Sequence, residues 1–342
     1  MKRGKIVKTL VGVVLFLMLI YGLWNRELVG YGLAQLSGQI HILRNTVPIE
    51  KALADTTLSS DERDKLLWIG QTVAFARDSL KLTTGDNYQT VYLSHGKPVL
   101  WVVTAAEPYS LTKYKWKFPF LGAVGYKGFF DFEKALAERD DLEGRGFDTD
   151  VSEVTAWSTL GFFSDPILSQ MLNRDSAALA ELIIHELTHT TFFISGDADL
   201  NENAATFIGR RGAEKLLLSK GLTKMYNHYK RSLEDKDRVK EYLKASALQL
   251  DSAYSGFARR TDWGSDQKEG AKKRLIRDIV LGMNNLPLHE PKNFTPERAA
   301  QFNNTFFTGY LMYNSMQDSL QTEYDYTFKG DLNAFIEHFK NM

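Results

Sequence analysis

The segment AELIIHELTHTTFFISGDADLNENAATFIG (residues 180–209) contains two histidines four positions apart, with a glutamate directly after the first. Residues at positions i and i+4 of an α-helix lie on one face, about one turn apart. A helix here would therefore place His185 and His189 side by side, with Glu186 next to them. This His-Glu-x-x-His pattern is typical of sites in which two imidazoles bind zinc and the glutamate activates a water molecule.

A catalytic zinc ion also needs a third protein ligand and an open fourth position. We expect the first helix to break at Gly196 and a second helix to begin near Asp199. The first turn of that second helix can then return to the metal-binding face, which makes Glu202 the predicted third ligand. The alternative role of Glu202 is to close a capping box with Asp199, because the two residues have the required spacing.

Carboxylates near the motif are candidates to orient the ligands. A zinc-bound imidazole usually donates its other N–H to a carboxylate or a carbonyl group. Asp197 and Asp199 are the candidates for this role, and a helix cap is an equal alternative for Asp199. Glu181, one turn before His185, would either support the site or face solvent.

Hydrolysis of a peptide bond places negative charge on the carbonyl oxygen, and this charge needs a donor besides the metal. Tyrosine or histidine commonly has this role. The sequence offers Tyr126, Tyr310 and Tyr313 as candidates. Nothing in their local sequence distinguishes them from ordinary core or surface tyrosines.

Composition indicates a folded globular protein without a strongly charged partner. The chain has 342 residues, with 42 basic and 42 acidic side chains and a formal net charge of zero, so nucleic acid is not an expected partner. The length suits one large domain or two subdomains. There is no cysteine. This excludes disulfides, thiolate zinc sites, a cysteine nucleophile and a lipid-anchored cysteine.

The N-terminus predicts a membrane anchor. Four basic residues precede TLVGVVLFLMLIYGLW (residues 9–24), a run without charge; they are Lys2, Arg3, Lys5 and Lys8. We expect residues 1–8 to be a basic cytoplasmic N-terminus and residues 9–26 a single-pass transmembrane signal-anchor, with the rest periplasmic or extracellular. The lipid bilayer is thus a predicted partner. A cleaved signal peptide is the alternative, but no small-x-small cleavage site follows the apolar run.

The remaining chain, residues 27–342, predicts an α+β fold. We expect helices and a small, mainly antiparallel sheet in residues 27–172, and a helical subdomain with the histidine motif in residues 173–342. The predicted helices span residues 28–54, 59–82, 131–144, 176–193, 200–220, 222–253 and 267–283. The predicted strands lie in residues 88–94 and 98–106, paired as a hairpin, and in residues 122–130 and 151–163. The charge-dense segment 228–244 is expected to form a solvated helix face.

Five blocks of sequence, in order, resemble the bacterial "putative aminopeptidase" family of zincin-type, gluzincin-like metallopeptidases. The blocks are YGLAQLSGQIHIL, FPFLGAVGYKGFFDFEKA, AWSTLGFFSDPILSQML, IIHELTHTTFFISGDADLNENAATFIG and FNNTFFTGYLMY, and they extend from Tyr31 to near the C-terminus. The resemblance implies one zinc ion bound by His185, His189 and Glu202, with Glu186 as general base. It also implies that the strands near GYKGFF and AWSTLGFF border the cleft. Many members look like lipoproteins with an anchoring cysteine, which this chain lacks, so its attachment would differ.

The sequence therefore predicts a membrane-anchored zinc peptidase, an aminopeptidase acting on peptide substrates. Two alternatives stay open. One is a zinc endopeptidase of the cell envelope, and the other is a non-catalytic helical envelope protein with a structural metal site or none. A structural zinc site usually has four protein ligands and favours cysteine, which argues against the last alternative. Cobalt or manganese could replace zinc in vitro.

Overall fold

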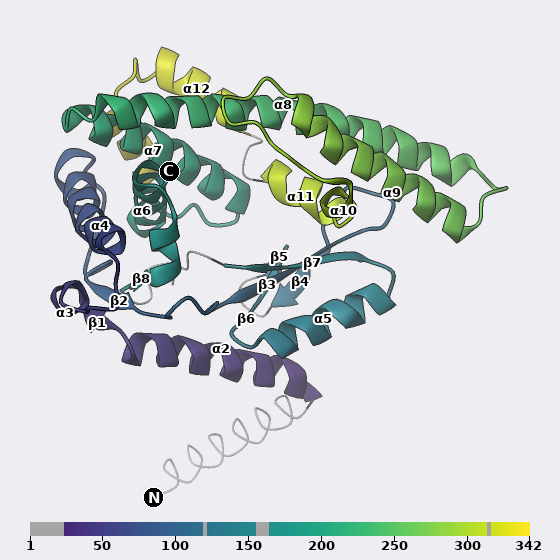
Figure 1. The fold of residues 1–342 in the computed structure, drawn as a ribbon, viewed down its shortest axis with the longest axis horizontal. Coiled ribbons are helices and arrows are strands. Elements are labelled where there is room, and N and C mark those ends of the chain that lie inside the picture. The colour runs from purple at the N-terminus through teal and green to yellow at the C-terminus, as the bar shows by residue number, and fades with distance from the viewer. Residues whose placement is uncertain (1–23, 119–121, 155–163, 313–315) are drawn as a thin grey trace, which may run out of the picture. The chain divides into compact units, whose positions relative to one another are not determined.

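The computed structural model describes residues 24–118, 122–154, 164–312 and 316–342 (Figure 1). The chain forms two compact units, Met1–Thr46 and Val47–Met342, and each is described by itself.

The described part of the first unit is helix α2 (Arg26–Arg44). The expected helix over residues 28–54 is therefore too long. Strand β1 (Val47–Pro48) and the short helix α3 (Ile49–Leu53) follow as separate elements of the second unit. Pro48 accounts for the break, because proline lacks a backbone N–H and disfavours helical dihedrals in the residue before it.

The predicted signal-anchor, residues 9–26, lies almost entirely outside the described residues. Among the residues that are described, no helix combines the length and the apolar character that a membrane span requires. The anchor stays a prediction.

The second unit contains three small sheets. One has the order β1-β2-β8, with β2 (Thr90–Tyr92) antiparallel to β1 and parallel to β8 (Ile167–Leu168). Another has the order β6-β3-β7 and is antiparallel; its strands are β6 (Lys127–Phe129), β3 (Trp101–Ala106) and β7 (Asp148–Glu153). The third pairs β4 (Trp116–Phe118) with β5 (Gly122–Val124).

The expected hairpin between residues 88–94 and 98–106 is wrong, because β2 and β3 belong to different sheets. The connection between them explains this result. His95 and Gly96 both adopt positive φ, of 52° and 77°. Pro98 then follows without an N–H to donate to a ladder. The chain therefore leaves the first sheet before β3 begins.

Helices cover both faces of the β6-β3-β7 sheet (Figure 1). Helix α5 (Phe132–Gly144), capped by Asp131, confirms the helix expected over residues 131–144 and packs on one face. Helix α11 (Asn304–Met312) packs on the other face. The remaining long helices are α4 (Ser60–Ser79), α6 (Ser176–Thr191), α7 (Ala198–Ser219), α8 (Thr223–Arg259) and α9 (Ser265–Gly282). Four of them lie close to their predicted ranges, whereas α8 continues to Arg259, beyond its predicted end at residue 253. The shorter helices are η1 (Ser169–Asn173), η2 (Met283–Asn285), α10 (Pro296–Ala299), α12 (Gln317–Tyr326) and α13 (Leu332–Lys340).

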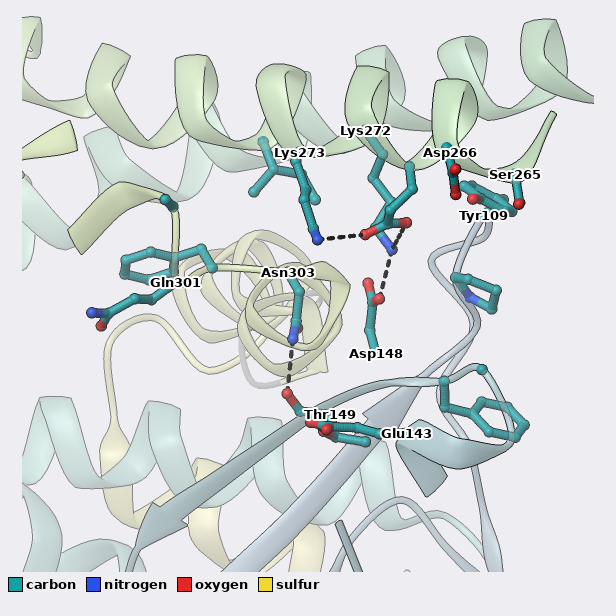
Figure 2. Close-up of a pocket in the computed structure, with 17 residues that line it drawn as sticks. Tyr109, Glu143, Asp148, Thr149, Ser265, Asp266, Lys272, Lys273, Gln301 and Asn303 are labelled. Atoms are coloured by element: carbon teal, nitrogen blue, oxygen red, sulfur yellow. Dashed lines mark hydrogen bonds and ion pairs between the residues drawn. The ribbon is translucent and has the colours of Figure 1, made fainter. Parts of the chain in front are cut away.

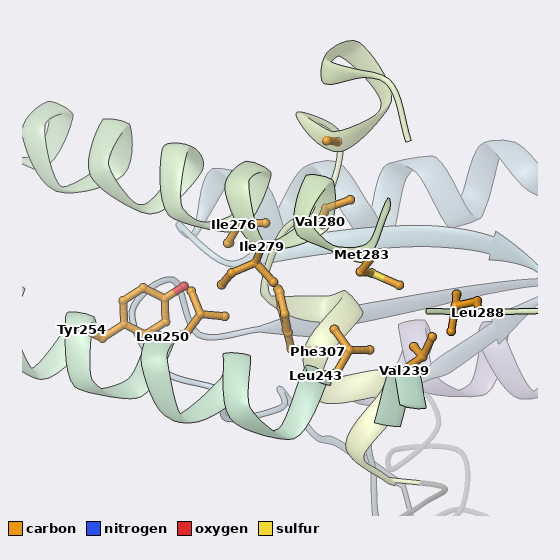
Figure 3. Packing of buried hydrophobic residues seen from close by; sticks show 11 residues of the cluster. Val239, Leu243, Leu250, Tyr254, Ile276, Ile279, Val280, Met283, Leu288 and Phe307 are labelled. Carbon is orange, nitrogen blue, oxygen red and sulfur yellow. The ribbon is translucent and has the colours of Figure 1, made fainter. Parts of the chain in front are cut away.

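A hydrophobic cluster joins α8, α9 and α11 (Figure 3). Leu243 and Leu250 of α8 meet Ile276 and Ile279 of α9, and Phe307 of α11 fills the space between them. Each such side chain contributes about 1.5–3 kcal/mol when it is fully buried. The charge-dense segment at the start of α8 is thus only partly solvated, since one of its faces belongs to this core.

Candidate metal centre

Helix α6 presents the two histidines on one face. It begins at its cap Asp175, whose Oδ1 accepts hydrogen bonds from the N–H groups of Ala177 and Ala178 at 3.0 and 2.9 Å. Its apolar side chains, including Ile183, Ile184 and Leu187, are fully buried. Their burial determines the orientation of α6 about its own axis.

The other face of α6 carries the imidazoles. The Nε2 atoms of His185 and His189 lie 3.1 Å apart. The i, i+4 spacing has therefore placed the two nitrogens where one ion could contact both.

The chain turns back after α6 through a loop that ends at Asp197. Gly196 has a φ of 86°, a conformation that favours glycine. Asp197 is the N-cap of α7, and its Oδ1 accepts a hydrogen bond from the N–H of Leu200 at 2.9 Å. Asp199 lies inside the first turn instead of at the cap. The alternative capping box of Asp199 with Glu202 therefore does not form.

Glu202 directs its carboxylate to the two imidazoles. Oε2 of Glu202 lies 3.5 Å from Nε2 of His185, and Oε1 lies 3.6 Å from Nε2 of His189. One ligand atom from each of the three residues lies within 4.8 Å of the others. Three ligands at about 2.0–2.1 Å from a tetrahedral zinc ion would be about 3.4 Å from one another. The three side chains therefore fit the donor set and the size of a zinc site with one position open for water.

Close packing of α7 on α6 makes this approach possible. A Cβ atom on Gly209 would lie 2.8 Å from the carbonyl oxygen of Glu181 and 3.2 Å from Cβ of His185. A Cβ atom on Gly212, one turn later, would lie 2.9 Å from Cγ2 of Ile184. The backbones can approach this closely only because both positions lack a side chain.

Thr206 lies beside Nδ1 of His185, the ring nitrogen that does not point to His189. Its Oγ1 lies 3.4 Å from Nδ1 of His185, and the residue is mostly buried. We did not identify Thr206 from the sequence, although it lies one turn after Glu202 on the same helix. Of the two predicted supports, Asp197 caps α7 with its carboxylate. Asp199 accepts a hydrogen bond from Nδ2 of Asn203 at 2.8 Å through its backbone carbonyl group, and a role of its carboxylate at the site stays a prediction.

Burial and neighbouring charges shift the pKa values of the three candidate ligands in different directions. Burial and the neighbouring His185 lower the pKa of His189 to about 4, so that this ring is neutral at neutral pH. Burial also lowers the pKa of His185, but Glu202 and Glu186 outweigh that effect and raise it above the usual value. The pKa of Glu202 is lowered: burial opposes this, and both histidines produce it. The carboxylate is therefore ionised and can act as a ligand.

Glu186, the predicted general base, is in a different environment. Burial raises its pKa, and the charge of Glu202 adds to this effect, while His185 partly offsets it. A raised pKa brings a carboxylate closer to the operating pH of a proton-transfer group. Tyr88 is almost fully buried, at 3% exposure. Burial raises the pKa of Tyr88 well above its usual value, and the negative charge of Glu186 adds to this effect. No pattern in the sequence pointed to Tyr88.

Glu181 joins three helices one turn below His185. Its Oε2 accepts hydrogen bonds from the hydroxyl group of Tyr229 at 2.9 Å and from Nζ of Lys236 at 3.2 Å. Its Oε1 lies 3.5 Å from Nε of Arg210. Burial would raise the pKa of Glu181, but Lys236 and Arg210 outweigh it and keep the pKa below its usual value. Glu181 therefore supports the packing of α6 against α7 and α8.

The three candidate tyrosines have different positions. Tyr126, just after β5, is 46% exposed. Desolvation raises its pKa, and the negative charges of Glu202 and Glu186 add to this effect, so the tyrosine lies within electrostatic range of both carboxylates. Tyr310 donates a hydrogen bond to the carbonyl oxygen of Lys236 at 3.0 Å, and its raised pKa of about 12 reflects burial. Tyr313 lies outside the described residues.

A cavity of about 630 Å³ lies elsewhere, between α9, the start of β7 and residues 300–303 (Figure 2). Nζ of Lys272, which is buried, lies 2.6 Å from Oδ1 of Asp148 and 3.3 Å from Oε2 of Glu269. Nδ2 of Asn303 donates a hydrogen bond to the carbonyl oxygen of Thr149 at 2.8 Å. The buried charges of this cavity pair with one another, so it offers no group comparable with the imidazole pair.

Comparison with known proteins supports the resemblance seen in the sequence. The family model described as "Putative aminopeptidase" matches residues 30–342, which is most of the chain. No curated protein and no solved structure matches the chain.

Proposed function

Because the chain belongs to the family described as "Putative aminopeptidase", we propose that it is a zinc-dependent aminopeptidase that hydrolyses peptide bonds. The observation that carries the proposal is the position of Glu202. Its two carboxylate oxygens lie 3.5 and 3.6 Å from the Nε2 atoms of His185 and His189. Two imidazoles and one carboxylate with an open fourth position are one of the established ligand sets of catalytic zinc sites.

In this proposal each residue of the site has its own role in the reaction. His185, His189 and Glu202 would hold the ion. Bound zinc would lower the pKa of a coordinated water molecule toward ~7 and polarise the scissile carbonyl group. Glu186 accepts the proton of the attacking water and returns it to the leaving amine. Its buried, pKa-raised carboxyl suits this double role.

Tyr126 is the proposed donor to the developing oxyanion. It lies between β5 and β6, within electrostatic range of Glu202 and Glu186, and the residue is 46% exposed. A pKa above the usual tyrosine value keeps the proton on the hydroxyl group, which can then donate a hydrogen bond. Tyr310 has a different role, because its hydroxyl group already donates to the carbonyl oxygen of Lys236.

The decisive experiment pairs metal analysis with peptide cleavage. Purified protein should contain one zinc ion per chain and should release the N-terminal residue from a library of unblocked peptides. Glu186→Gln should retain zinc and lose activity by several orders of magnitude. Glu337→Gln on α13, whose side chain is 60% exposed, is the matched control and should remain active. Full activity of Glu186→Gln would rule out the proposed mechanism.

Blocked peptides separate the two enzyme alternatives. An aminopeptidase should not cleave N-acetylated peptides, whereas an endopeptidase should cleave them internally. A chain that binds zinc but cleaves neither substrate would instead be the non-catalytic protein with a structural site.

We also propose that the chain is held in a membrane by residues 9–26, with the catalytic unit in the periplasm or outside the cell. The proposal is supported by the uncharged run of residues 9–24, which directly follows four basic residues at the N-terminus. Full-length protein should stay with membranes through alkaline extraction, and a chain without residues 1–26 should not. Release of the full-length protein by alkali would exclude the anchor.

A further inference from the structure

Glu202 lies between two asparagines that are almost fully buried. Asn201 is 2% exposed and Asn203 is fully buried. Polar side chains are rarely buried without hydrogen-bond partners. Both asparagines have such partners, and these partners lie in two different segments of the chain.

Asn201 holds the loop between α6 and α7. Its Nδ2 donates hydrogen bonds to the carbonyl oxygens of Ile194 and Asp197, both at 2.7 Å, and its Oδ1 accepts one from the N–H of Ile194 at 2.9 Å. Ile194 follows the end of α6 at Thr191. One amide group therefore ties the beginning of α7 to the chain that leaves the histidine helix.

Asn203 ties the same turn of α7 to the C-terminal part of the chain. Its Oδ1 accepts hydrogen bonds from the N–H of Met316 at 3.1 Å and from Nε2 of Gln317 at 3.2 Å. Nε2 of Gln317 also donates to the carbonyl oxygen of Asn203 at 2.9 Å. The Nδ2 group of Asn203 bonds to the carbonyl oxygen of Asp199 at 2.8 Å.

We infer that Asn201 and Asn203 are positioning residues that hold Glu202 in the geometry of the third metal ligand. This inference rests on the proposed metal site. The first turn of a helix has unsatisfied N–H groups and frays easily. A glutamate has three rotatable bonds, so the direction of its carboxylate depends on the backbone that carries it. The two amides fix that backbone on both sides of Glu202.

The side-chain chemistry explains why asparagine suits position 201. The side chain meets two carbonyl oxygens and one N–H group of the loop, so it must donate and accept at once. An amide does both, whereas a carboxylate only accepts and an alanine does neither.

The test compares metal affinity in matched asparagine variants. Asn284 is the control, because its Nδ2 donates to the carbonyl oxygen of Phe294 at 2.9 Å and its Oδ1 accepts from the N–H of Phe294 at 2.8 Å. Asn284→Ala therefore removes the same reciprocal pair of bonds from the loop after η2. Zinc affinity of the full chain is measured by competition with a chromophoric chelator, and the visible spectrum of the cobalt-substituted protein reports the ligand set.

Asn201→Ala and Asn203→Ala should each weaken zinc binding about 10–100-fold, the usual effect of losing a support of a ligand. Both substitutions should also change the intensity of the visible absorption bands of the cobalt-substituted protein. Asn284→Ala should lower thermal stability without changing either signal. If Asn201→Ala does not fold, the zinc affinity of Asn203→Ala decides the test. This variant keeps the hydrogen bonds that Asn201 makes in the α6–α7 loop.

Wild-type affinity and an unchanged cobalt spectrum in the folded asparagine variants would overturn the inference while leaving the proposed zinc site intact. Failure of the wild-type protein to bind zinc would instead overturn the proposed function. A wild-type protein that binds zinc without cleaving peptides would leave the positioning role standing and exclude only the catalytic part.

Discussion

Gly209 of α7 faces the carbonyl oxygen of Glu181 on α6 so closely that a Cβ atom at position 209 would lie 2.8 Å from that oxygen. The contact partner is backbone and cannot rotate away. His185 lies directly beside it, with its Cβ atom 3.2 Å from the same point. The separation of α6 and α7, and hence the span between His185 and Glu202, depends on the absence of a side chain here.

Gly209→Ala should therefore destabilise the protein and weaken zinc binding. Overpacking of this kind costs about 1–3 kcal/mol, and outward movement of α7 carries Glu202 with it. Urea unfolding and zinc competition measure the two effects. Gly70→Ala in α4 is the control, because nothing lies within 4 Å of its Cβ position. That change should stabilise the protein by about 1 kcal/mol through helix propensity. A stable Gly209→Ala protein with normal affinity would contradict the packing argument.

Loss of the Thr206 hydroxyl group should reduce metal affinity. Thr206→Val removes the oxygen 3.4 Å from Nδ1 of His185 and leaves that ring free to reorient. We expect zinc binding to weaken about 10-fold. Thr308→Val on α11 is the matched control, since its buried hydroxyl group donates a hydrogen bond to the carbonyl oxygen of Thr305 at 3.2 Å, away from the imidazole pair. Equal zinc affinities of the two variants would show that Thr206 does not orient the ligand.

Tyr126→Phe should lower kcat and leave KM nearly unchanged, because an oxyanion donor acts in the transition state. The expected loss is about 10²-fold in kcat. Steady-state kinetics on an unblocked peptide gives both constants. Tyr310→Phe loses a hydrogen bond to a backbone carbonyl group instead, so its kcat should stay near that of the wild type. A larger loss in Tyr310→Phe than in Tyr126→Phe would reverse the assignment.

Glu181→Gln should make the protein less stable at neutral pH, with a difference that shrinks in acid. The folded-state pKa of Glu181 is lowered, so the ionised group contributes stability above its unfolded pKa of about 4.3. This contribution is lost as the pH falls through the folded-state pKa. Urea unfolding should show a loss of about 1–3 kcal/mol at pH 7 and a smaller loss below pH 4. A difference that does not depend on pH would mean that the charge of Glu181 contributes nothing.

Removal of zinc should lower the thermal midpoint of the second unit. An ion that binds only the folded state adds about 4 kcal/mol at a free concentration of 1,000 times Kd. A chelator should therefore lower the midpoint of the wild-type protein but not that of Glu202→Ala, which lacks the third ligand. Equal midpoints with and without the chelator in the wild type would argue against a zinc site between α6 and α7.

The convergence of His185, His189 and Glu202 could be predicted from the sequence because their relation is local. Two histidines one turn apart and a short return through Gly196 leave little freedom for where Glu202 goes. Thr206 was available by the same reasoning, since it lies one turn after Glu202. Tyr126 could be named but not chosen over Tyr310, because its approach to the site depends on strands far away in the sequence.

Strand pairing was predicted less well for a physical reason. Alternating apolar residues indicate a strand but do not identify its partner. The sequence therefore suggested a hairpin of β2 with β3, whereas β2 pairs in parallel with β8, with Val91 opposite Ile167. The end of α2 was also misplaced, although Pro48 was a visible signal for an earlier break.

The bonds from Asn203 to Met316 and Gln317 also bear on how far the chain can be shortened. A fragment truncated after α11 would retain His185, His189 and Glu202. It would still leave the buried oxygen of Asn203 exposed to water, next to the turn that carries Glu202. The shortest fragment that can hold the proposed zinc site is therefore longer than the histidine motif and its following helix, and it must include α12.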